Sequence, residues 1–232
     1  MSAEPSSIPG WLQPLATASR DVQARDLTRF VPPAGNLARP ASVLVLLGGD
    51  DSPDESRHVL LLERAHDLRS HAGQIAFPGG AHDLGDTDAV ATALREAEEE
   101  TGLDPAGIEV VATLQKLWLP PSNFEVTPVV AWWRTPSPVR AVDPAETASV
   151  HIVALAELLD PVNRVTMRHP SGYRGPAFLV ADLVVWGFTA GLLSRLFALV
   201  GWERPWDAAK VVHLSPELLA LASDPRRERV EP

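Results

Sequence analysis

The sequence predicts an α/β (α+β) fold in which helices cover a mixed central sheet. Three observations predict it. The chain has 232 residues, of which 45% are hydrophobic, and this is enough to bury one sizeable core. Short aliphatic and aromatic runs alternate with turn-forming segments through the middle of the chain, and helical patterns occupy both ends. This order favours a layered single domain over an all-parallel sheet.

The first forty residues are the least regular part of the sequence. Prolines recur on both sides of one predicted helix, residues 15–30. We therefore expect residues 1–40 to form an N-terminal arm packed on the core, and residues 41–222 to form the main domain. Residues 223–232 are polar, and we expect them to form a flexible tail.

The regular elements begin after the arm. Aliphatic runs at 42–47 and 58–62 flank the polar segment GGDDSPDES, and this order predicts a β-hairpin. Helices are predicted at 87–101, where Gly102 supplies a C-terminal stop, and at 154–160. Branched and aromatic residues predict three further strands, over residues 108–117, 126–133 and 150–153.

Residues 183–200 form an almost continuously apolar stretch whose length approaches that of a membrane span. Arg195 lies inside it and no basic cluster flanks it, so we expect a helix packed in the core or in a dimer seam. This stretch and the arm together suggest a homodimer. The N-terminus has no basic segment followed by an apolar run, which favours a cytoplasmic protein.

The composition excludes several classes of function. The formal net charge is −10 at pH 7, which argues against binding to nucleic acid through bulk positive charge. There is no cysteine, and this excludes a disulfide framework, a thiolate nucleophile and a cysteine-ligated metal. Any metal bound by this chain must therefore be held by oxygen or imidazole ligands.

The helix predicted at 87–101 carries the clearest chemical signal. Glu96, Glu99 and Glu100 are spaced i, i+3 and i+4, so their carboxylates share one face within one turn. Such a cluster costs roughly a few tenths of a kcal/mol per pair unless a cation neutralises it. A solvated acidic helix face is the alternative. The preceding FPGG favours a site for a hard cation such as Mg²⁺, Mn²⁺ or Ca²⁺, because its glycines allow close approach and its carbonyls can add an oxygen ligand.

These residues carry a family resemblance. The run REAEEETGL, residues 95–103, is similar to the REUxEExGU half of the Nudix box, in which U is aliphatic. The full box begins with a glycine, five residues, a glutamate and seven residues. Here Gly80 is followed by five residues and Asp86, and eight residues precede Arg95. The chain thus resembles Nudix hydrolases with one change of identity and one of spacing, and the resemblance implies a Nudix-like α/β/α sandwich.

A second resemblance lies upstream. LLLERAHDLRSHAGQIAFPGG, residues 60–80, is similar to LLTxR(S/A)xxxRxxxGxxxFPGG, the signature of the coenzyme A diphosphatase branch, with Leu62 in place of threonine. It implies hydrolysis of the diphosphate bond of coenzyme A or its derivatives, giving adenosine 3',5'-bisphosphate and 4'-phosphopantetheine. One alternative is a Nudix pyrophosphatase acting on ADP-ribose, dinucleotides or nucleoside triphosphates. The other is a non-catalytic nucleotide-binding regulatory module.

The resemblance also implies a metal site. A diphosphate would be repelled by an acidic protein, so the expected cofactor is Mg²⁺ or Mn²⁺, which bridges carboxylates and phosphates. The expected metal ligands are Glu96, Glu99 and Glu100, with Gly80 contributing its carbonyl oxygen. The candidates for the general base are Glu100, Glu99 and two loop carboxylates, first Glu146 and then Glu125.

Substrate contacts are expected from Arg64, Arg69 and Gly79, because these residues match the signature and a guanidinium suits phosphate. His71 and His82 are near the signature but are left outside this set. Core packing is the expectation for the tryptophans, of which adjacent Trp132 and Trp133 must point to opposite faces of a strand. Trp118 is the one most readily placed near an adenine.

Overall fold

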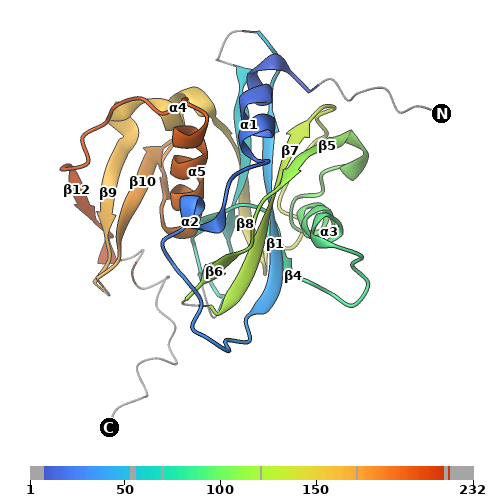
Figure 1. Cartoon of the computed structure of the whole chain (residues 1–232), viewed down its shortest axis with the longest axis horizontal. Helices are drawn as coiled ribbons and strands as arrows, with labels where there is room; N and C mark the ends of the chain where they lie inside the picture. Colours follow the sequence, from blue (N-terminus) through green and yellow to red (C-terminus); the bar gives the residue numbers. More distant parts are fainter. Residues whose placement is uncertain are drawn as a thin grey trace.

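The structure is a computed structural model that describes residues 8–52, 56–68, 71–120, 122–170, 172–216 and Leu219. In the cartoon, α3 (Ala89–Thr101) lies on one side of the central sheet (Figure 1). Helix α5 (Gly187–Leu199) lies on the other side, between this sheet and a second, smaller one. The predicted α/β/α sandwich with a mixed central sheet is therefore confirmed.

The elements of the described residues are as follows. The remaining α-helices are α1 (Gln13–Ala18), α2 (Ala24–Leu27) and α4 (Leu155–Leu159). The central sheet contains β1 (Arg39–Gly48), β2 (His58–Arg64), β3 (Ile75–Ala76), β4 (Gly79–Ala81), β5 (Ile108–Thr113), β6 (Leu117–Leu119), β7 (Phe124–Trp133) and β8 (Thr147–Ala154). The smaller sheet contains β9 (Arg164–Arg168), β10 (Arg174–Val180), β11 (Leu183–Val185) and β12 (Val211–His213).

The central sheet is mixed because β1 has partners of both directions. It runs parallel to β7 from Arg39 opposite Phe124 to Leu47 opposite Trp132. It runs antiparallel to β2 at Leu47 opposite Val59, which confirms the predicted hairpin. Farther along, β1 and β2 separate, and β4 pairs with β1 while β3 and β8 pair with β2. This separation brings the segment that carries the signature between the two strands.

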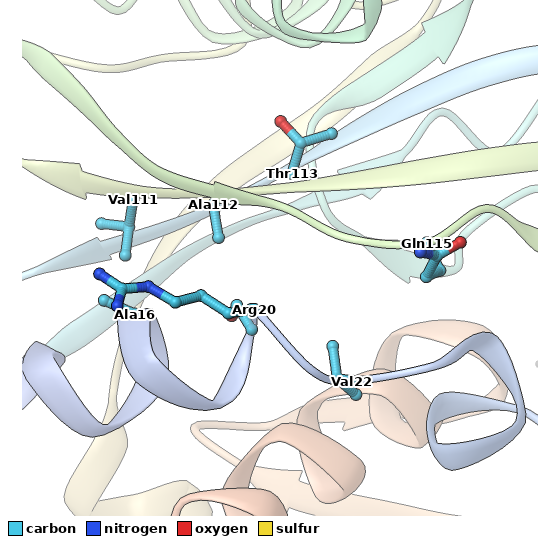
Figure 2. Close-up of a pocket in the computed structure, with 8 residues that line it drawn as sticks. Ala16, Arg20, Val22, Val111, Ala112, Thr113 and Gln115 are labelled. Atoms are coloured by element: carbon cyan, nitrogen blue, oxygen red, sulfur yellow. The ribbon is translucent and has the colours of Figure 1, made fainter.

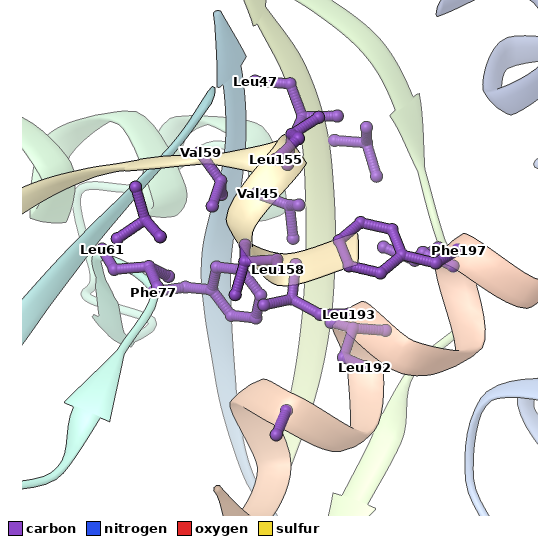
Figure 3. Close-up of a cluster of buried hydrophobic side chains, with 14 of the residues drawn as sticks. Val45, Leu47, Val59, Leu61, Phe77, Leu155, Leu158, Leu192, Leu193 and Phe197 are labelled. Carbon is purple, nitrogen blue, oxygen red and sulfur yellow. The ribbon is translucent and has the colours of Figure 1, made fainter. Parts of the chain in front are cut away.

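Alternation along the strands divides the core into two faces. Leu44 and Leu46 of β1 pack with Ala93 and Ala97 of α3 on one face. On the other face Val45, Leu47, Leu193 and Phe197 belong to one continuous buried cluster (Figure 3). Trp132 packs against this second cluster and Trp133 lies in the first, so the expectation that they point to opposite faces is confirmed. The side chains of α3 that do not pack on the sheet are thus free to form a polar site.

The smaller sheet is absent from the sequence prediction. It is joined to α5 by Arg164, whose side chain is fully buried. Its guanidinium donates to Glu203 Oε1 and Ser194 Oγ, each at 2.8 Å, and it stacks on the rings of Phe178 and Trp206. A buried charge needs such partners to offset its desolvation. Because those partners lie far apart in the sequence, no local pattern predicts the arrangement.

The prediction of one helix over residues 15–30 is wrong. Helix α1 ends at Ala18, where both the backbone N–H and the hydroxyl of Ser19 donate to Leu15 O. Helix α2 begins separately at Ala24 and has a capping box of its own. Val22 lies in the segment between the two helices and is buried in the same core cluster as Leu15 and Leu27. The arm boundary at residue 40 stays a prediction, and the proposed tail lies outside the described residues.

Two other predicted elements are divided in the structure. In the apolar stretch 183–200, the first residues form β11 opposite β10, because Val184 and Val185 extend the smaller sheet, and the helix begins only at Gly187. The strand predicted over 108–117 ends at Thr113, and β6 begins at Leu117. Within the described residues, no helix is long and apolar enough to cross a membrane.

Candidate active site

Helix α3 is held firmly at both ends. The Asp88 carboxylate accepts the N–H of Ala91 at 2.9 Å and caps the first turn. Gly102 takes the left-handed conformation that ends the helix, with φ of 68°. Ala93 and Ala97 pack on the sheet, and their small side chains let the helix approach closely. The orientation of the helix, and of the carboxylates it carries, is therefore fixed by packing.

The three carboxylates differ in exposure. The side chain of Glu100 is 6% exposed, that of Glu96 is 18% exposed and that of Glu99 is 57% exposed. The cluster is thus not a fully solvated acidic helix face. Its two more buried members are Glu96 and Glu100, which lie one turn apart on the side of the helix nearest β4.

The glycines of FPGG bring backbone against these carboxylates. The Gly79 N–H donates to Glu100 Oε2 at 2.9 Å. Gly79 has a positive φ of 152°, and a Cβ there would collide with the carbonyl oxygen of Ser42 on β1. At Gly80 a Cβ would collide with the carboxylate of Glu96. Gly79 therefore excludes larger residues, whereas a side chain at Gly80 would have to displace the Glu96 carboxylate.

Arg95 organises the outer side of the cluster. Its guanidinium makes a two-fold contact with Asp86, Nε to Oδ1 at 2.9 Å and Nη2 to Oδ2 at 3.0 Å. It also reaches Glu96 Oε1 at 3.0 Å, Glu99 Oε2 at 3.0 Å and Ala81 O at 3.1 Å. Asp86, the residue that departs from the Nudix box, thus holds the arginine in place across the longer loop.

The electrostatics of the cluster favour a bound cation. Burial raises the pKa of Glu100 to about 7, and repulsion from Glu96 and Glu146 adds to it, against the opposing effects of the Gly79 N–H and Arg64. Burial likewise raises the pKa of Glu96, with Glu99 and Glu146 adding repulsion and Arg95 opposing it. Ionised carboxylates in this position are therefore unfavourable without added positive charge. By contrast, the hydrogen bonds from Arg95 hold the pKa of Asp86 well below its usual range.

Two more predicted site residues lie beside Glu100. Arg64, at the end of β2, places Nη1 3.9 Å from Glu100 Oε1. Glu146 lies in the loop before β8, and its charge acts on both buried carboxylates of α3. Its backbone carbonyl accepts the N–H of Ala65, so this loop is joined directly to the end of β2. Arg69, the second predicted phosphate contact, lies outside the described residues.

The two histidines near the signature have local partners. His82 Nδ1 lies 2.9 Å from Thr92 Oγ1, and this contact joins the loop after β4 to α3. His71 Nδ1 lies 3.1 Å from Gln74 Oε1, and burial lowers the pKa of the His71 ring. Both contacts are within or beside the loops that frame the cluster, and they restrain those loops.

Glu125 and Trp118 lie together at another part of the sheet. Glu125 forms an ion pair with Lys116 at 2.9 Å, and the Trp118 indole N–H donates to Asn123 Oδ1 at 3.0 Å. They border a hollow of about 250 Å³ that is closed by the α2 segment and contains none of the α3 carboxylates. The second choice of base and the proposed adenine contact are therefore not brought to the cluster.

A further hollow of about 390 Å³ lies between α1 and β5, with Arg20 extended along α1 (Figure 2). It contains none of the predicted site residues. Its lining is Ala16, Ser19, Arg20, Val22, Val111, Ala112, Thr113 and Gln115. None of the α3 carboxylates is among these residues, so the hollow is separate from the candidate site.

Comparison with known proteins agrees with the box and the fold. A family model described as the NUDIX domain matches residues 38–172, more than half of the chain. The chain belongs to the Nudix hydrolase family. It is accordingly a Nudix diphosphohydrolase, and such enzymes generally use divalent metal ions such as Mg²⁺ or Mn²⁺ and act on nucleotide-type substrates.

The chain is similar to several individual proteins. A protein of Escherichia coli K12 named "Uncharacterized Nudix hydrolase NudL" is 37% identical over 174 residues, which cover 70% of this chain and 83% of the relative. "Nudix hydrolase 15, mitochondrial" of Arabidopsis thaliana is 33% identical over 192 residues, covering 78% and 63%. The solved structure of the Nudix hydrolase RenU from M. smegmatis is 24% identical, covers 70% and 86%, and has a TM-score of 0.46.

The donor set of α3 fits a hard divalent cation in its chemistry. Glu96, Glu99 and Glu100 offer only carboxylate oxygens, and the two buried ones need positive charge nearby. In the part of the chain that the structure describes, no three acidic or histidine side chains already converge as a metal cage. Arg95 bonds to an oxygen of Glu96 and of Glu99, and the Gly79 N–H bonds to an oxygen of Glu100.

Proposed function

We propose that this Nudix hydrolase cleaves the diphosphate bond of coenzyme A or its derivatives, giving adenosine 3',5'-bisphosphate and 4'-phosphopantetheine. The observation that carries the proposal is the segment 60–80, which matches the coenzyme A diphosphatase signature at Arg64 and at FPGG. The same segment contributes Arg64 and Gly79 to the immediate surroundings of Glu100. The residues of the signature and those of the Nudix box therefore belong to one site.

Within this proposal Glu96, Glu99 and Glu100 hold Mg²⁺ or Mn²⁺, with the Gly80 carbonyl as a further ligand. The bound ion would neutralise the diphosphate and activate the attacking water. Glu96 and Glu100 are proposed as the principal ligands because they are the two least exposed of the three carboxylates. Glu99 is exposed and can reach the ion once it leaves Arg95.

The remaining side chains bind phosphate and move a proton. Arg64 has the planar donor geometry that suits a phosphate oxygen, and Arg69 and Gly79 are proposed as further substrate contacts. Glu146 is proposed as the general base that removes a proton from the attacking water, since its carboxylate faces the two buried glutamates from another loop. Glu100 and Glu99 are the other candidates for this role.

A substrate panel tests the proposal. Coenzyme A, acetyl-coenzyme A, ADP-ribose and NADH are supplied at equal concentration with Mg²⁺ or Mn²⁺, and the products are identified by mass spectrometry. The proposal requires a clear preference for the coenzyme A compounds, with the two products named above. A preference for ADP-ribose or NADH would replace it with the alternative Nudix pyrophosphatase. Absence of turnover on every Nudix substrate tried, with nucleotide binding retained, would favour a regulatory module.

Two expectations about the whole protein stay predictions. The apolar faces of α5 are buried against the core of the same chain, so this helix does not supply a free dimer seam. A homodimer is therefore proposed only from the arm, and light scattering that gives a mass of one chain would retract it. A cytoplasmic location is likewise proposed from the sequence, and fractionation of cells that express the chain would test it.

A further inference from the structure

A chain of polar side chains lies on the face of the sheet opposite the carboxylates of α3. The Ser149 hydroxyl of β8 donates to Glu63 Oε2 of β2 at 2.9 Å, and Ser149 Oγ lies 2.7 Å from His151 Nε2. The second oxygen of the same carboxylate, Glu63 Oε1, lies 2.8 Å from His66 Nε2. We call Glu63 and Ser149, with these two histidines, the β2–β8 clamp.

Proton counting fixes the direction of these bonds. A hydroxyl has one proton, and Ser149 gives it to the carboxylate, so His151 must donate its Nε2–H to the Ser149 oxygen. The ionised carboxylate of Glu63 accepts from Ser149 and, on its other oxygen, from His66. Bonds to a charged acceptor are stronger than neutral ones. The clamp is therefore a series of hydrogen bonds that connects β8, through the Glu63 carboxylate, to the turn after β2.

The clamp lies at an irregularity in strand pairing. Glu63 is opposite Ser149, but Arg64 is opposite Thr147, so the register shifts by one residue between them. Bulges of this kind re-aim side chains, and a slip of one residue exchanges the faces to which they point. The Glu63–Ser149 bond is thus a specific cross-strand contact directly beside the bulge.

Strand alternation connects the clamp with the catalytic side. Leu61 packs in the α5 cluster and Leu60 in the α3 cluster. By alternation Glu63 lies on the same face of β2 as Leu61, whereas Arg64 points toward α3 and Glu100. On β8 the register shift determines how the chain leaves the loop that carries Glu146. The Ala65 N–H also bonds the Glu146 carbonyl next to this point. The main chain of the two strands thus joins the clamp on one face to Glu146 on the other.

We propose that Glu63 and Ser149 are positioning residues that hold the Glu146 carboxylate against the α3 carboxylates. This inference rests on the proposed role of Glu146 as general base. It concerns Glu63, at a position that the signature of residues 60–80 leaves unspecified, and Ser149, which lies outside both family signatures. The clamp itself touches no substrate. Its loss lets the bulge and the loop before β8 relax, which lowers the fraction of molecules with Glu146 in the productive position. The expected consequence is a lower kcat with little change in KM.

The test is a double-mutant cycle between Ser149→Ala and Glu146→Gln, measured with both coenzyme A and ADP-ribose. We expect Ser149→Ala to lower kcat about tenfold in the wild type and less than about twofold in the Glu146→Gln background. Ser149→Thr, which keeps the hydroxyl, should restore most of kcat. Ile152→Ala, on an exposed position of the same strand, is the matched control and should leave kcat unchanged. Thermal melts verify that each variant is folded.

Each outcome decides the point. A full tenfold loss of kcat in both backgrounds would show that Ser149 acts independently of Glu146, and it would overturn the proposed positioning role. Wild-type kcat in Ser149→Ala would overturn that role as well. Wild-type kcat in the single variant Glu146→Gln would overturn both the positioning role of Glu63 and Ser149 and the assignment of Glu146 as general base. An error in the proposed substrate can be distinguished from an error in the positioning role. It would change which of the two compounds is hydrolysed, but the relative kcat values of the four proteins in the double-mutant cycle would stay the same.

Discussion

The two faces of the central sheet carry different kinds of residue. On the α3 face, small alanines bring a helix close to the sheet and leave its other side to charged residues held by loops and arginines. On the α5 face, one continuous apolar cluster joins the arm, α4, α5 and the strands. We infer that the charged residues of the α3 face determine activity and that the apolar cluster of the α5 face determines stability. Substitutions on the two faces should therefore separate the two properties.

The largest effect is expected from Glu100→Gln on the α3 face. The substitution removes the charge of a buried metal ligand that also receives the Gly79 N–H. We expect kcat to fall by about 10²–10⁴-fold while the melting temperature stays the same or rises, because a raised pKa shows that the ionised carboxylate is unfavourable there. Steady-state kinetics with Mn²⁺ and a thermal melt measure the two properties.

Glu98→Gln is the matched control for this experiment, since it makes the same charge change at an exposed position of the same helix. It should change neither kcat nor Mn²⁺ affinity in calorimetric titration. If Glu98→Gln reduced turnover as much as Glu100→Gln does, the net charge of the helix and not a defined site would be responsible. Equal Mn²⁺ binding by wild type and Glu100→Gln would remove Glu100 from the metal ligands.

On the α5 face, Leu193→Ala should show the opposite behaviour. Leu193 is 1% exposed within the large cluster, so truncation leaves a cavity and should lower the free energy of unfolding by about 2–5 kcal/mol. Urea denaturation measures this loss. Turnover per folded molecule should stay near that of the wild type at a temperature where the variant is folded. A loss of kcat beyond the unfolded fraction would break the division between the two faces.

The α3 face could be predicted from the sequence because its information is local. The spacing of Glu96, Glu99 and Glu100 fixes their common face, and Gly102 marks the helix end within the same short segment. The approach of Gly79 and Gly80 to these carboxylates follows from the same motif, although no pattern gives the partners of Asp86. The Asp86–Arg95 ion pair depends on the conformation of the loop between β4 and α3. The changed spacing of the box gives no pattern from which that conformation could be predicted.

The α5 face and the smaller sheet could not be predicted in the same way. Residues 183–200 have one apolar character throughout, yet they divide into β11 and α5 because β10 provides pairing partners for the first part. The arm is also divided, and the core in which Leu15, Val22 and Leu27 are buried is built with strands far along the chain. The Glu63–Ser149 bond joins residues 86 positions apart; the signature leaves the position of Glu63 unspecified, and Ser149 belongs to no recognisable motif.

A smaller effect is expected from pH on the stability of the metal-free protein. Burial raises the pKa of Glu100 from its ordinary value of 4.5 to about 7, so between these pH values the folded state retains a proton that the unfolded state has lost. The stabilisation is present below pH 4.5 and is lost as pH rises toward 7. Relative to Glu100→Gln, the wild type should lose up to about 3 kcal/mol over this window. Urea denaturation in EDTA measures it, and an unchanged difference between the two proteins would contradict it.

The smallest effect is expected from Asp86→Asn, which tests how the α3 face tolerates its departure from the box. The change weakens the two-fold contact with Arg95, so the guanidinium should move toward Glu96 and Glu99 and compete with the metal. We expect Mn²⁺ affinity to fall about tenfold, with kcat at saturating Mn²⁺ nearly restored. Asp86→Glu should give a weaker loss because it keeps the charge. If kcat of Asp86→Asn at saturating Mn²⁺ fell as far as that of Glu100→Gln, Asp86 would have to take part in the reaction itself. Its ion pair with Arg95 could then no longer be regarded as only holding the arginine in place.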